Sequence, residues 1–557
     1  MSSQNKLIFL PLGGAGEIGM NMYLYGYGPL GKERFIMVDM GVTFPAMDGT
    51  PGVDLIMADP AYIEARVDRL DAIFITHAHE DHIGALGLLY PKLAVPVYAR
   101  PFTAAVARAK MEDRGQDPWV VQVVDAYPTQ VEAGPFKVSY LPLAHSIPEA
   151  AGLIIETPAG RIVHTGDFKL DKDPIVGEAY DPALFAQVAQ GGIKALVCDS
   201  TNVFSPDAGR SESTLNANIT KLISEASGMM VATTFASNVA RLKTLAQAGV
   251  DAGRSVCVLG RSMQRMMGYA HSTEVLGDFP PLIELEDAQS VPRENLMLIV
   301  TGSQGESRAA SGQLARGKYL GLTMQEGDTF LFSSKTIPGN EVSVGRIVNS
   351  FSEMGVKVID DSSGLYHVSG HANRPDLEEV HDIFKPEMLI PMHGEHRHLR
   401  EHMELAESKG IASIIAPNGA MIDLTGKKPK VLEHIETSRL YLDGNQLIGA
   451  FDGVVLERIR MATRGLVALS IIIEENEVIG VWAEAMGLPN TLGTQQTDLN
   501  ELIELGVEKE LQSAKPKLLN SDDEVERLVT RTVNRICREA VGKKPISQVM
   551  INRLVAD

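Results

Sequence analysis

Cysteine is scarce in this chain of 557 residues: it has only Cys198, Cys257 and Cys537, and no two of them form a Cys-x-x-Cys pair. The scarcity excludes a disulfide framework and a cysteine zinc cluster, and it indicates a reducing, cytoplasmic location. Long apolar runs are lacking as well, since no stretch reaches the roughly 18 apolar residues that a membrane-spanning helix needs. We therefore expect a cytoplasmic protein that does not contact the membrane.

Positively charged residues are fewer than negatively charged ones. Lys and Arg number 51 against 71 Asp and Glu, which gives a formal net charge of −20. This balance excludes a generally basic protein that coats nucleic acid or lipid through its overall field, although it allows a local basic groove. A hydrophobic content of 44% with 22% charged residues is typical of a folded globular chain, and the length predicts two to four domains.

Two styles of sequence alternate along the chain. Short apolar strands broken by Gly, Pro and Asp fill residues 1–205 and return at 366–430. Between them, residues 206–365 alternate helical stretches with apolar strands such as Met230–Thr233, a pattern typical of a doubly wound α/β unit. The simplest interpretation is a mostly β domain into which an α/β domain is inserted.

The remainder of the chain is predicted to contain a linker at 431–463 and a small α/β domain at 464–557. The segment taken as a linker follows a short run of lysines and consists of short turns. The last domain begins with two strands, and its helix over Asp522–Ala540 carries its apolar residues on one face.

The glycines in Gly14-Ala15-Gly16-Glu17-Ile18-Gly19 have the spacing of a dinucleotide-binding turn, and Asp39 lies twenty residues further on. Such a turn must lead into a helix. Residues 21–29 instead alternate in the manner of a strand and then break at Gly28 and Pro29. We therefore interpret the glycines as tight turns beside a buried site.

The strongest chemical signal is His77-Ala78-His79-Glu80-Asp81-His82, directly after an apolar strand. In an extended chain His77 and His79 project to the same side, so both imidazoles can bind one ion. Because the chain then turns into a helix, Asp81 and His82 can face a second ion. A solvated polar loop is the alternative, but so many ligand-type side chains in six residues favour a metal site.

Three later residues, His145, Asp167 and His393, also follow apolar strands. Each alone is typical of a packed core or loop, but together with the first cluster they complete two sites. The predicted ligands are His77, His79 and His145 for one ion, Asp81, His82 and His393 for the other, and Asp167 as a bridge. Nitrogen and oxygen ligands suit two Zn²⁺ per subunit, with Mn²⁺ or Mg²⁺ as substitutes or assistants. Two such ions activate water, so the predicted chemistry is hydrolysis.

This pattern resembles the metallo-β-lactamase family, which implies an αββα sandwich with ligands at the ends of strands. In this chain 226 positions separate Asp167 from His393, which leaves room for the inserted α/β domain. That arrangement resembles the β-CASP nucleases, and Asp199, His371 and His393 match their additional motifs. The fold class implied is therefore α/β, with a sandwich, an inserted doubly wound β-CASP domain and a small C-terminal α/β domain.

The resemblance narrows to the bacterial ribonuclease J family. Three segments carry it: the opening glycines, His367–Ala372 and Pro391–Glu395. The resemblance implies a two-metal ribonuclease that degrades single-stranded RNA 5′-to-3′, prefers 5′-monophosphate ends and also cleaves internally, in rRNA processing and mRNA decay. It further implies a homodimer or homotetramer in which the C-terminal domain supports assembly.

Residue roles follow from the same resemblance. Asp81, His371 and Asp199 are the expected catalytic residues. His371 would protonate the departing 3′ oxygen while Asp199 orients its ring, although a merely packed loop histidine is the alternative. Asp39 matches an aspartate that orients a ligand histidine from behind the metals.

The expected substrate contacts lie in two segments and one strand end. Backbone N–H groups and imidazoles over 367–371 form a plausible phosphate cradle, and Ser333 adds a hydroxyl. Phe235 would stack on a base and Asn238 would hydrogen-bond nearby; a core Phe235 and a helix-capping Asn238 fit the residue types equally well. The full expected set is Phe235, Ala236, Ser237, Asn238, Ser333, His367, Val368, Ser369, Gly370 and His371.

Three other functions remain open at this point. A small-molecule metallohydrolase, such as a thioesterase or lactonase, agrees with the acidic charge but leaves the insertion unexplained. A DNA-directed β-CASP nuclease remains because the contacts that recognise a 2′-hydroxyl cannot be identified from sequence. An inactive scaffold is the third, and the intact set of ligand residues argues against it.

Overall fold

The computed structural model describes residues 5–46, 49–475, 477–492 and 497–554. The chain divides into two compact units. One contains the chain up to Thr43 together with Met57–Arg439, and the other contains Phe44–Ile56 and the chain from Leu440 onward. Within the described ranges, no helix has both the length and the apolar character needed to cross a membrane.

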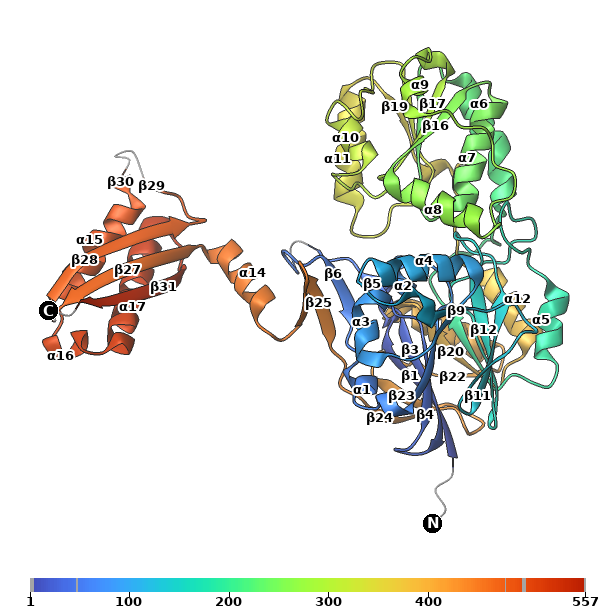
Figure 1. Ribbon diagram of the computed structural model, residues 1–557, viewed down its shortest axis with the longest axis horizontal. Coiled ribbons are helices and arrows are strands. Elements are labelled where there is room, and N and C mark those ends of the chain that lie inside the picture. The colour runs from blue at the N-terminus through green and yellow to red at the C-terminus, as the bar shows by residue number, and fades with distance from the viewer. Residues whose placement is uncertain (1–4, 47–48, 476, 493–496, 555–557) are drawn as a thin grey trace. The chain divides into compact units, whose positions relative to one another are not determined.

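Two mixed sheets form the centre of the first unit (Figure 1). The first sheet has the order β24-β23-β1-β3-β4-β7-β8-β9, with β24 (Lys430–His434), β23 (Ala420–Asp423), β1 (Asn5–Gly13), β3 (Met22–Pro29), β4 (Arg34–Val38), β7 (Leu70–Phe74), β8 (Val97–Ala99) and β9 (Val121–Val123). The second has the order β10-β11-β12-β13-β14-β20-β22, with β10 (Val131–Ala133), β11 (Phe136–Pro142), β12 (Ala151–Thr157), β13 (Gly160–His164), β14 (Ala195–Asp199), β20 (Met388–Met392) and β22 (Ala412–Ser413).

The core of this unit lies between the two sheets, where side chains such as Phe9, Val38 and Val197 are fully buried. Helices α5 (Pro182–Ala189), α12 (Arg374–Phe384) and α13 (His396–Ser408) cover the outer face of the second sheet, and α3 (Leu86–Leu93) and α4 (Pro101–Glu112) lie beside the first. The predicted αββα sandwich is confirmed. The strand β3 also confirms that the glycine turn before it does not lead into a helix.

The inserted domain begins and ends at neighbouring strands of the second sheet. β14 and β20 pair in parallel, with Asp199 opposite Met392, so the chain leaves the sandwich after one strand and returns in the next. β13 pairs in parallel with β14. The carboxyl ends of these three strands therefore share one edge of the sheet.

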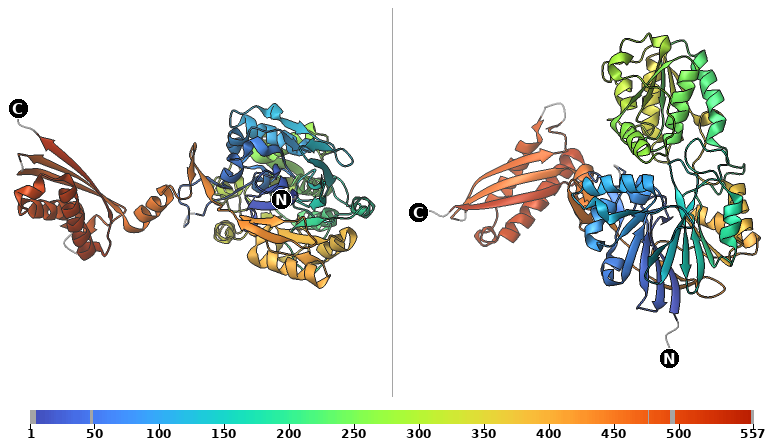
Figure 2. Two further views of the ribbon diagram at one scale, coloured as in Figure 1. Left: turned by 90° about the horizontal axis from the view of Figure 1, so that it is seen from below. Right: turned by 45° about the vertical axis from the view of Figure 1, so that its right-hand side comes forward.

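The insertion is a doubly wound domain, as predicted (Figure 2). Its parallel sheet has the order β16-β17-β15-β18-β19, and two separate apolar clusters fill the spaces between the sheet and the helices on its two faces. The strands are β15 (Met230–Thr233), β16 (Ser255–Leu259), β17 (Leu296–Val300), β18 (Thr329–Phe332) and β19 (Lys357–Ile359); the helices are α6 (Asn216–Glu225), α7 (Val239–Asp251), α8 (Arg261–Ser272), α9 (Leu285–Ala288), α10 (Ala310–Ala315) and α11 (Glu341–Glu353).

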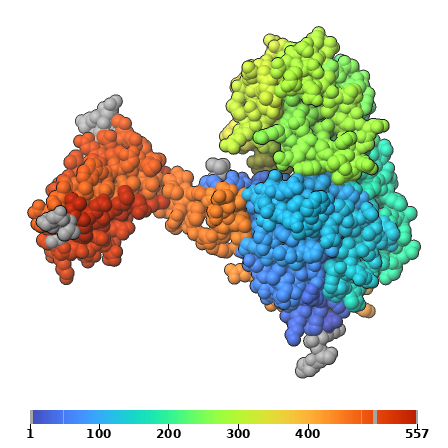
Figure 3. All heavy atoms as spheres, viewed as in Figure 1, coloured from blue at the N-terminus to red at the C-terminus, as the bar shows by residue number. Residues whose placement is uncertain are grey.

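The described residues within 466–554 form one compact body, shown in orange and red in Figure 3. Its sheet has the order β28-β27-β31, and helices pack on one face around a core that includes Val467, Val529 and Ile503. The elements are β27 (Leu466–Glu474), β28 (Glu477–Met486), β31 (Ile546–Leu554), α15 (Leu499–Gln512), α16 (Pro516–Leu519) and α17 (Asp522–Val541). Alternate residues of β28 and β31, including Trp482, Met486 and Met550, remain about half exposed on this body.

The stretch predicted to be a linker, 431–463, is more regular than expected. β24 pairs with β23 and so belongs to the first sheet. β25 (Arg439–Asp443) and β26 (Gln446–Gly449) then form a hairpin, and α14 (Val454–Arg464) follows. These strands are short; β24 is mostly exposed, and β25 and β26 are mostly half-buried, so none has the long apolar run from which a buried strand is predicted. The predicted domain bounds themselves stay a prediction.

Candidate metal centre and active site

Every predicted ligand follows the carboxyl end of a strand in the sandwich. β7 leads to His77, β13 leads to Asp167, and β20 leads to His393. β4 and β7 are parallel in one sheet, as are β13, β14 and β20 in the other, so these ends gather at common edges. The fold therefore collects ligand-type side chains that are far apart in sequence.

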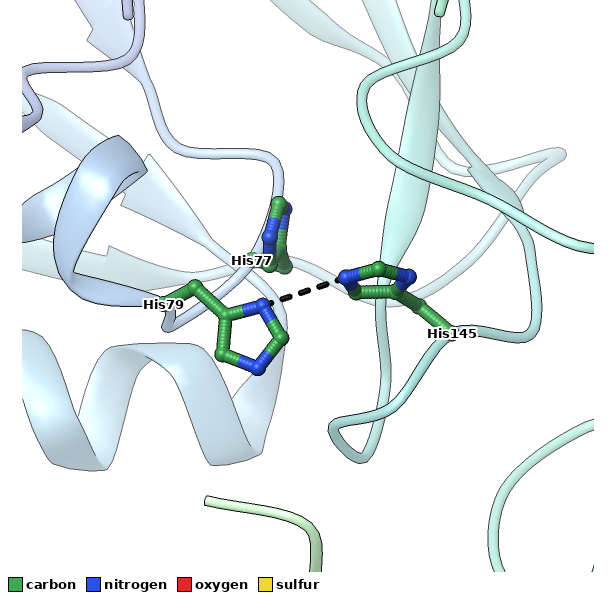
Figure 4. Close-up of side chains that lie close together, drawn as sticks. All are labelled: His77, His79 and His145. Carbon is green, nitrogen blue, oxygen red and sulfur yellow. Dashed lines mark hydrogen bonds between the residues drawn. The ribbon is translucent and has the colours of Figure 1, made fainter. Parts of the chain in front are cut away.

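The first group consists of His77, His79 and His145, and one ring nitrogen of each lies within 4.8 Å of the other two (Figure 4). Nε2 of His145 is 3.1 Å from Nδ1 of His79. In a tetrahedral zinc site with Zn–N bonds of roughly 2.0–2.1 Å, the nitrogens stand about 3.3 Å apart. Nε2 of His77 is buried and has no hydrogen-bond partner among the residues that the structure describes. A metal ion would satisfy this orphaned nitrogen.

The other ring nitrogens of His77 and His145 already have hydrogen-bond partners. Nδ1 of His145 is 2.6 Å from the carbonyl oxygen of Gly370, and Nδ1 of His77 is 3.0 Å from Oγ1 of Thr76. His145 must donate to that carbonyl, which leaves its Nε2 lone pair for a ligand bond. Burial lowers the pKa of His77 and His145 well below the ordinary value and that of His79 to about 4, so all three rings are neutral.

Gly370 is required by this close approach. A Cβ atom there would lie 2.8 Å from Oγ of Ser146 and 2.9 Å from the ring of His145. Any larger residue would push the carbonyl away from the histidine that it orients.

The second group consists of Asp81, His82, Asp167 and His393. Oδ2 of Asp81 is 3.2 Å from Nε2 of His393. Oδ2 of Asp167 is 3.3 Å from Nε2 of His82, 3.8 Å from Nε2 of His145 and 3.9 Å from Nε2 of His77. One carboxylate oxygen thus borders both groups, which is the position that the sequence predicted for a bridging ligand. Its role as a ligand stays a prediction.

The electrostatics of the second group also fit a cation. Although burial opposes the charge, Asp167, Asp81 and Asp39 raise the pKa of His82 to about 10. Burial also lowers the pKa of His393, but Asp167 outweighs this effect and raises the pKa well above its ordinary value. The carboxylates hold these protons because negative charge is concentrated there, and a divalent cation would meet the same field. The donor set is therefore suited to holding metal ions.

Asp39 lies behind this group, where the sequence placed it. Its Oδ2 is 2.7 Å from Nδ1 of His82, and its Oδ1 accepts a 2.8 Å hydrogen bond from the backbone of Thr76. Asp39 is fully buried and has a φ of +63°, an uncommon conformation for an aspartate. Nδ2 of Asn21 lies 3.0 Å from Nε2 of His82. This residue was not identified from the sequence.

His371 and Asp199 lie beside the ligand groups. Nδ1 of His371 is 2.8 Å from Oδ2 of Asp199, and the His371 side chain is 21% exposed. Although burial opposes it, Asp199 raises the pKa of His371. Ligand-type atoms of Asp167, Asp199, His371 and His393 also lie within 4.8 Å of one another, so His371 borders the second group. A protonated ring facing the metal groups suits an acid, and this role stays a prediction.

Thr201 is a site residue that sequence analysis missed. Its hydroxyl donates to Oδ1 of Asp199 at 2.8 Å and lies 3.0 Å from Nδ1 of His393. It therefore connects the predicted orienting aspartate to a predicted ligand. Its position two residues after Asp199 was the only feature of the sequence that could have indicated its place in the site.

The predicted phosphate cradle is only partly accessible. His367 and Ser369 are half-buried, whereas Val368 is 6% exposed and its side chain packs in the core of the inserted domain, so only its backbone is available. Ser333 is fully buried and its hydroxyl donates to the carbonyl oxygen of Tyr366 at 2.7 Å. We expected the Ser333 hydroxyl to donate to a ligand. It could do so only if its hydrogen bond to Tyr366 were broken.

The structure resolves the two interpretations of the 235–238 segment in part. Asn238 is 4% exposed and caps α7, because its side chain accepts a 2.9 Å hydrogen bond from the backbone of Arg241. The capping alternative is therefore correct for Asn238. Phe235, Ala236 and Ser237 are half-buried at the turn before the helix, and contact of this turn with a substrate stays a prediction.

Four family models match successive parts of the chain. They are the metallo-beta-lactamase superfamily at 16–200, the beta-CASP domain of ribonuclease J at 227–351, the Zn-dependent metallo-hydrolase RNA specificity domain at 364–417, and the C-terminal domain of ribonuclease J at 453–554.

Whole proteins match as well. Ribonuclease J of Sinorhizobium meliloti is 39% identical over 561 residues, which cover 100% of this chain and 98% of that protein. Ribonuclease J of Mycolicibacterium smegmatis is 34% identical, with 96% and 95% covered. Among solved structures, a protein of unknown function from Enterococcus faecalis V583 aligns with a TM-score of 0.53 over 75% of this chain and 100% of its own, at 17% identity, which is a likeness of fold.

Substituting His77 tests the first ligand group. In His77→Ala, we expect the metal content after zinc loading and removal of excess zinc to fall by about one ion per chain or more, because a three-histidine site loses a ligand. Mass spectrometry of the metal content measures this. His396→Ala removes an exposed histidine and is the control. Full metal retention by His77→Ala would contradict the assignment.

Proposed function

The chain belongs to the ribonuclease J family of metal-dependent ribonucleases, and we propose that it degrades single-stranded RNA 5′-to-3′ with two zinc ions, prefers 5′-monophosphate ends and also cleaves internally. The observation that carries the proposal is the position of Asp167 Oδ2 between two ligand groups, with His371 at their border. RNA maturation and decay are the processes that such an activity serves.

Three histidines, His77, His79 and His145, would hold one ion, and Asp81, His82 and His393 would hold the other, with Asp167 shared. When bound, the zinc ions supply Lewis acidity that activates water and offsets the charge of the phosphodiester. Mn²⁺ or Mg²⁺ are the alternatives that oxygen ligands allow. The orphaned Nε2 of His77 and the carboxylates around His82 support this assignment.

His371 would protonate the departing 3′ oxygen. Asp199 accepts from Nδ1 of His371 at 2.8 Å, so in the charged ring the proton on Nε2 is the one available to a substrate. The raised pKa of His371 supports a ring that carries this proton at neutral pH.

The 5′ phosphate would lie against the 367–371 segment. Arg241, Lys335 and Lys169 stand close enough to His367 to lower its pKa, after burial, to about 3. Glu212 pairs with Arg241 and Asp171 with Lys169, whereas Lys335 is exposed; cations brought together in an otherwise acidic chain support an anion site there. A terminal phosphate held at a fixed distance from the reacting bond would produce mononucleotides.

The C-terminal domain would support a homodimer or homotetramer. Its sheet carries helices on one face, while Trp482, Met486 and Met550 are 53%, 54% and 51% exposed. Large apolar side chains gathered on an exposed sheet face are typical of an association surface. We propose that a second copy of this chain covers it.

The test of the proposed activity compares one RNA sequence with a 5′ monophosphate, triphosphate or hydroxyl, and a matched single-stranded DNA. We expect mononucleotides to appear fastest from the monophosphate RNA, because only that end fits a pocket for one phosphate. Thin-layer chromatography of the labelled products measures this. Inertness toward every nucleic acid, with metal bound, would favour a small-molecule hydrolase, and faster cleavage of DNA would favour a DNA-directed nuclease.

His371→Ala should slow RNA cleavage by about 10²- to 10⁴-fold, the usual contribution of a general acid, with metal content unchanged. Single-turnover rates and metal analysis on the same preparation measure both quantities. Asp199→Asn should slow cleavage in the same direction because its amide no longer fixes the charged ring. Loss of metal from His371→Ala would show that His371 is a ligand instead.

Trp482→Glu should shift the assembly to a smaller species, because a charge placed on the proposed contact must be desolvated when copies associate. Sedimentation velocity measures the change in mass. Leu505→Glu, at an exposed position of α15, is the control on the same domain. An unchanged assembly in Trp482→Glu would remove this face from the interface.

A further inference from the structure

Arg241 is an unusual residue of the inserted domain, because a full positive charge on α7 has no exposed surface. Its guanidinium group forms a two-pronged ion pair with Glu212, one bond running from Nε to Oε1 and the other from Nη2 to Oε2 at 2.9 Å. Glu212 is itself 4% exposed. Burying an ion pair this deeply costs a considerable desolvation free energy. A contribution to stability is therefore a poor explanation for the presence of this pair.

The third nitrogen of Arg241 reaches the proposed phosphate cradle. Nη1 donates to the carbonyl oxygen of Ser333 at 2.6 Å, lies 3.1 Å from Oγ of Ser333, and lies 3.2 Å from Nδ1 of His367. The backbone N–H of Arg241 is the group that Asn238 caps. Arg241 therefore joins the 235–238 turn, the end of β18 and the start of the 367–371 segment.

Arginine stays protonated in proteins and can only donate hydrogen bonds. Nδ1 of His367 must therefore accept, so the ring is neutral and carries its proton on Nε2. Oγ of Ser333 accepts from the same nitrogen, and its own proton goes to the carbonyl oxygen of Tyr366. One permanent cation thus sets the hydrogen directions of two groups in the cradle.

We propose that Arg241, held in place by Glu212, is a positioning residue that fixes His367 with its N–H at Nε2 and so sets the preference for a 5′ phosphate. The proposal rests on the proposed function, in which the 367–371 segment holds the 5′ phosphate. A neutral ring with a fixed donor offers the phosphate a hydrogen bond that a freely tautomerising ring offers only part of the time. Arg241 acts through His367 and needs no contact with RNA.

The test is Arg241→Lys, which keeps a positive charge but lacks the planar fork that binds Glu212 and His367 together. The holoenzyme and the variant are compared on one RNA with a 5′ monophosphate or a 5′ hydroxyl. We expect the ratio of kcat/KM for the two RNAs to fall about tenfold, which corresponds to one hydrogen bond to a charged group. Most of the change should appear in KM of the monophosphate RNA.

Arg254→Lys is the matched control. Arg254 is 7% exposed in the same domain, and its guanidinium donates to the carbonyl oxygens of Gly228, Leu296, Ile223 and Ala226. None of these belongs to the cradle. Arg254→Lys should lower the unfolding temperature as Arg241→Lys does but keep the wild-type ratio.

Glu212→Gln keeps the side-chain shape, weakens the ion pair and should lower the ratio in the same direction, which keeps the test valid if Arg241→Lys does not fold. A wild-type ratio in the folded variants would overturn the positioning role while leaving the proposed end preference in place. An equal loss on both RNAs would overturn it too. A wild-type enzyme that does not distinguish the two ends would overturn the end preference and the role of Arg241 together.

Discussion

The parallel pairing of β14 with β20 is the constraint on which the rest of the structure depends. It places Asp199 opposite Met392 although an entire α/β domain lies between them in sequence. The chain leaves the sheet at the carboxyl end of β14 and, after the insertion, returns beside Asp199 at His371; α12 then leads to the amino end of β20, whose carboxyl end is followed by His393. The 367–371 segment, which returns from the insertion, then contributes both His371 and the Gly370 carbonyl that orients His145.

A second feature recurs through the site: in several imidazoles, one ring nitrogen is fixed by a neighbouring acceptor or donor. Asp39 does this for His82, the Gly370 carbonyl for His145, and Asp199 for His371. Arg241 has the opposite effect on His367, because the guanidinium can only donate and Nδ1 of the ring must accept the hydrogen bond. Acceptors behind a ring favour ligation or acid catalysis at the far nitrogen, whereas a cation behind a ring leaves a neutral donor there.

Much of the ligand cluster could be predicted from sequence because strand ends, spacing and residue type carry the same information. His77 and Asp167 each follow a recognisable apolar strand, and the structure brings them together. The backbone carbonyl of Gly370 could not be predicted, since every residue has one and only the tertiary fold aims it. Arg241 was missed for a related reason: its sequence context is an ordinary amphipathic helix, and its burial depends on Glu212 in another element. The strand β24 was missed because a short exposed strand has no apolar pattern.

The acidic balance of the chain and the binding of a polyanion are compatible because the positive charge is local. A net charge of −20 gives no general attraction to RNA. At one end of the site Arg241, paired with Glu212, lies 3.2 Å from Nδ1 of His367, and Lys335 and Lys169 also act on this ring. At the other end, carboxylates concentrate the negative charge that metal ions would neutralise. An RNA would then be held where its 5′ phosphate and its reacting phosphate meet these two points together, and repelled elsewhere. Under the proposed function, the distance between the two points, more than overall affinity, would determine which bond of the RNA is cleaved.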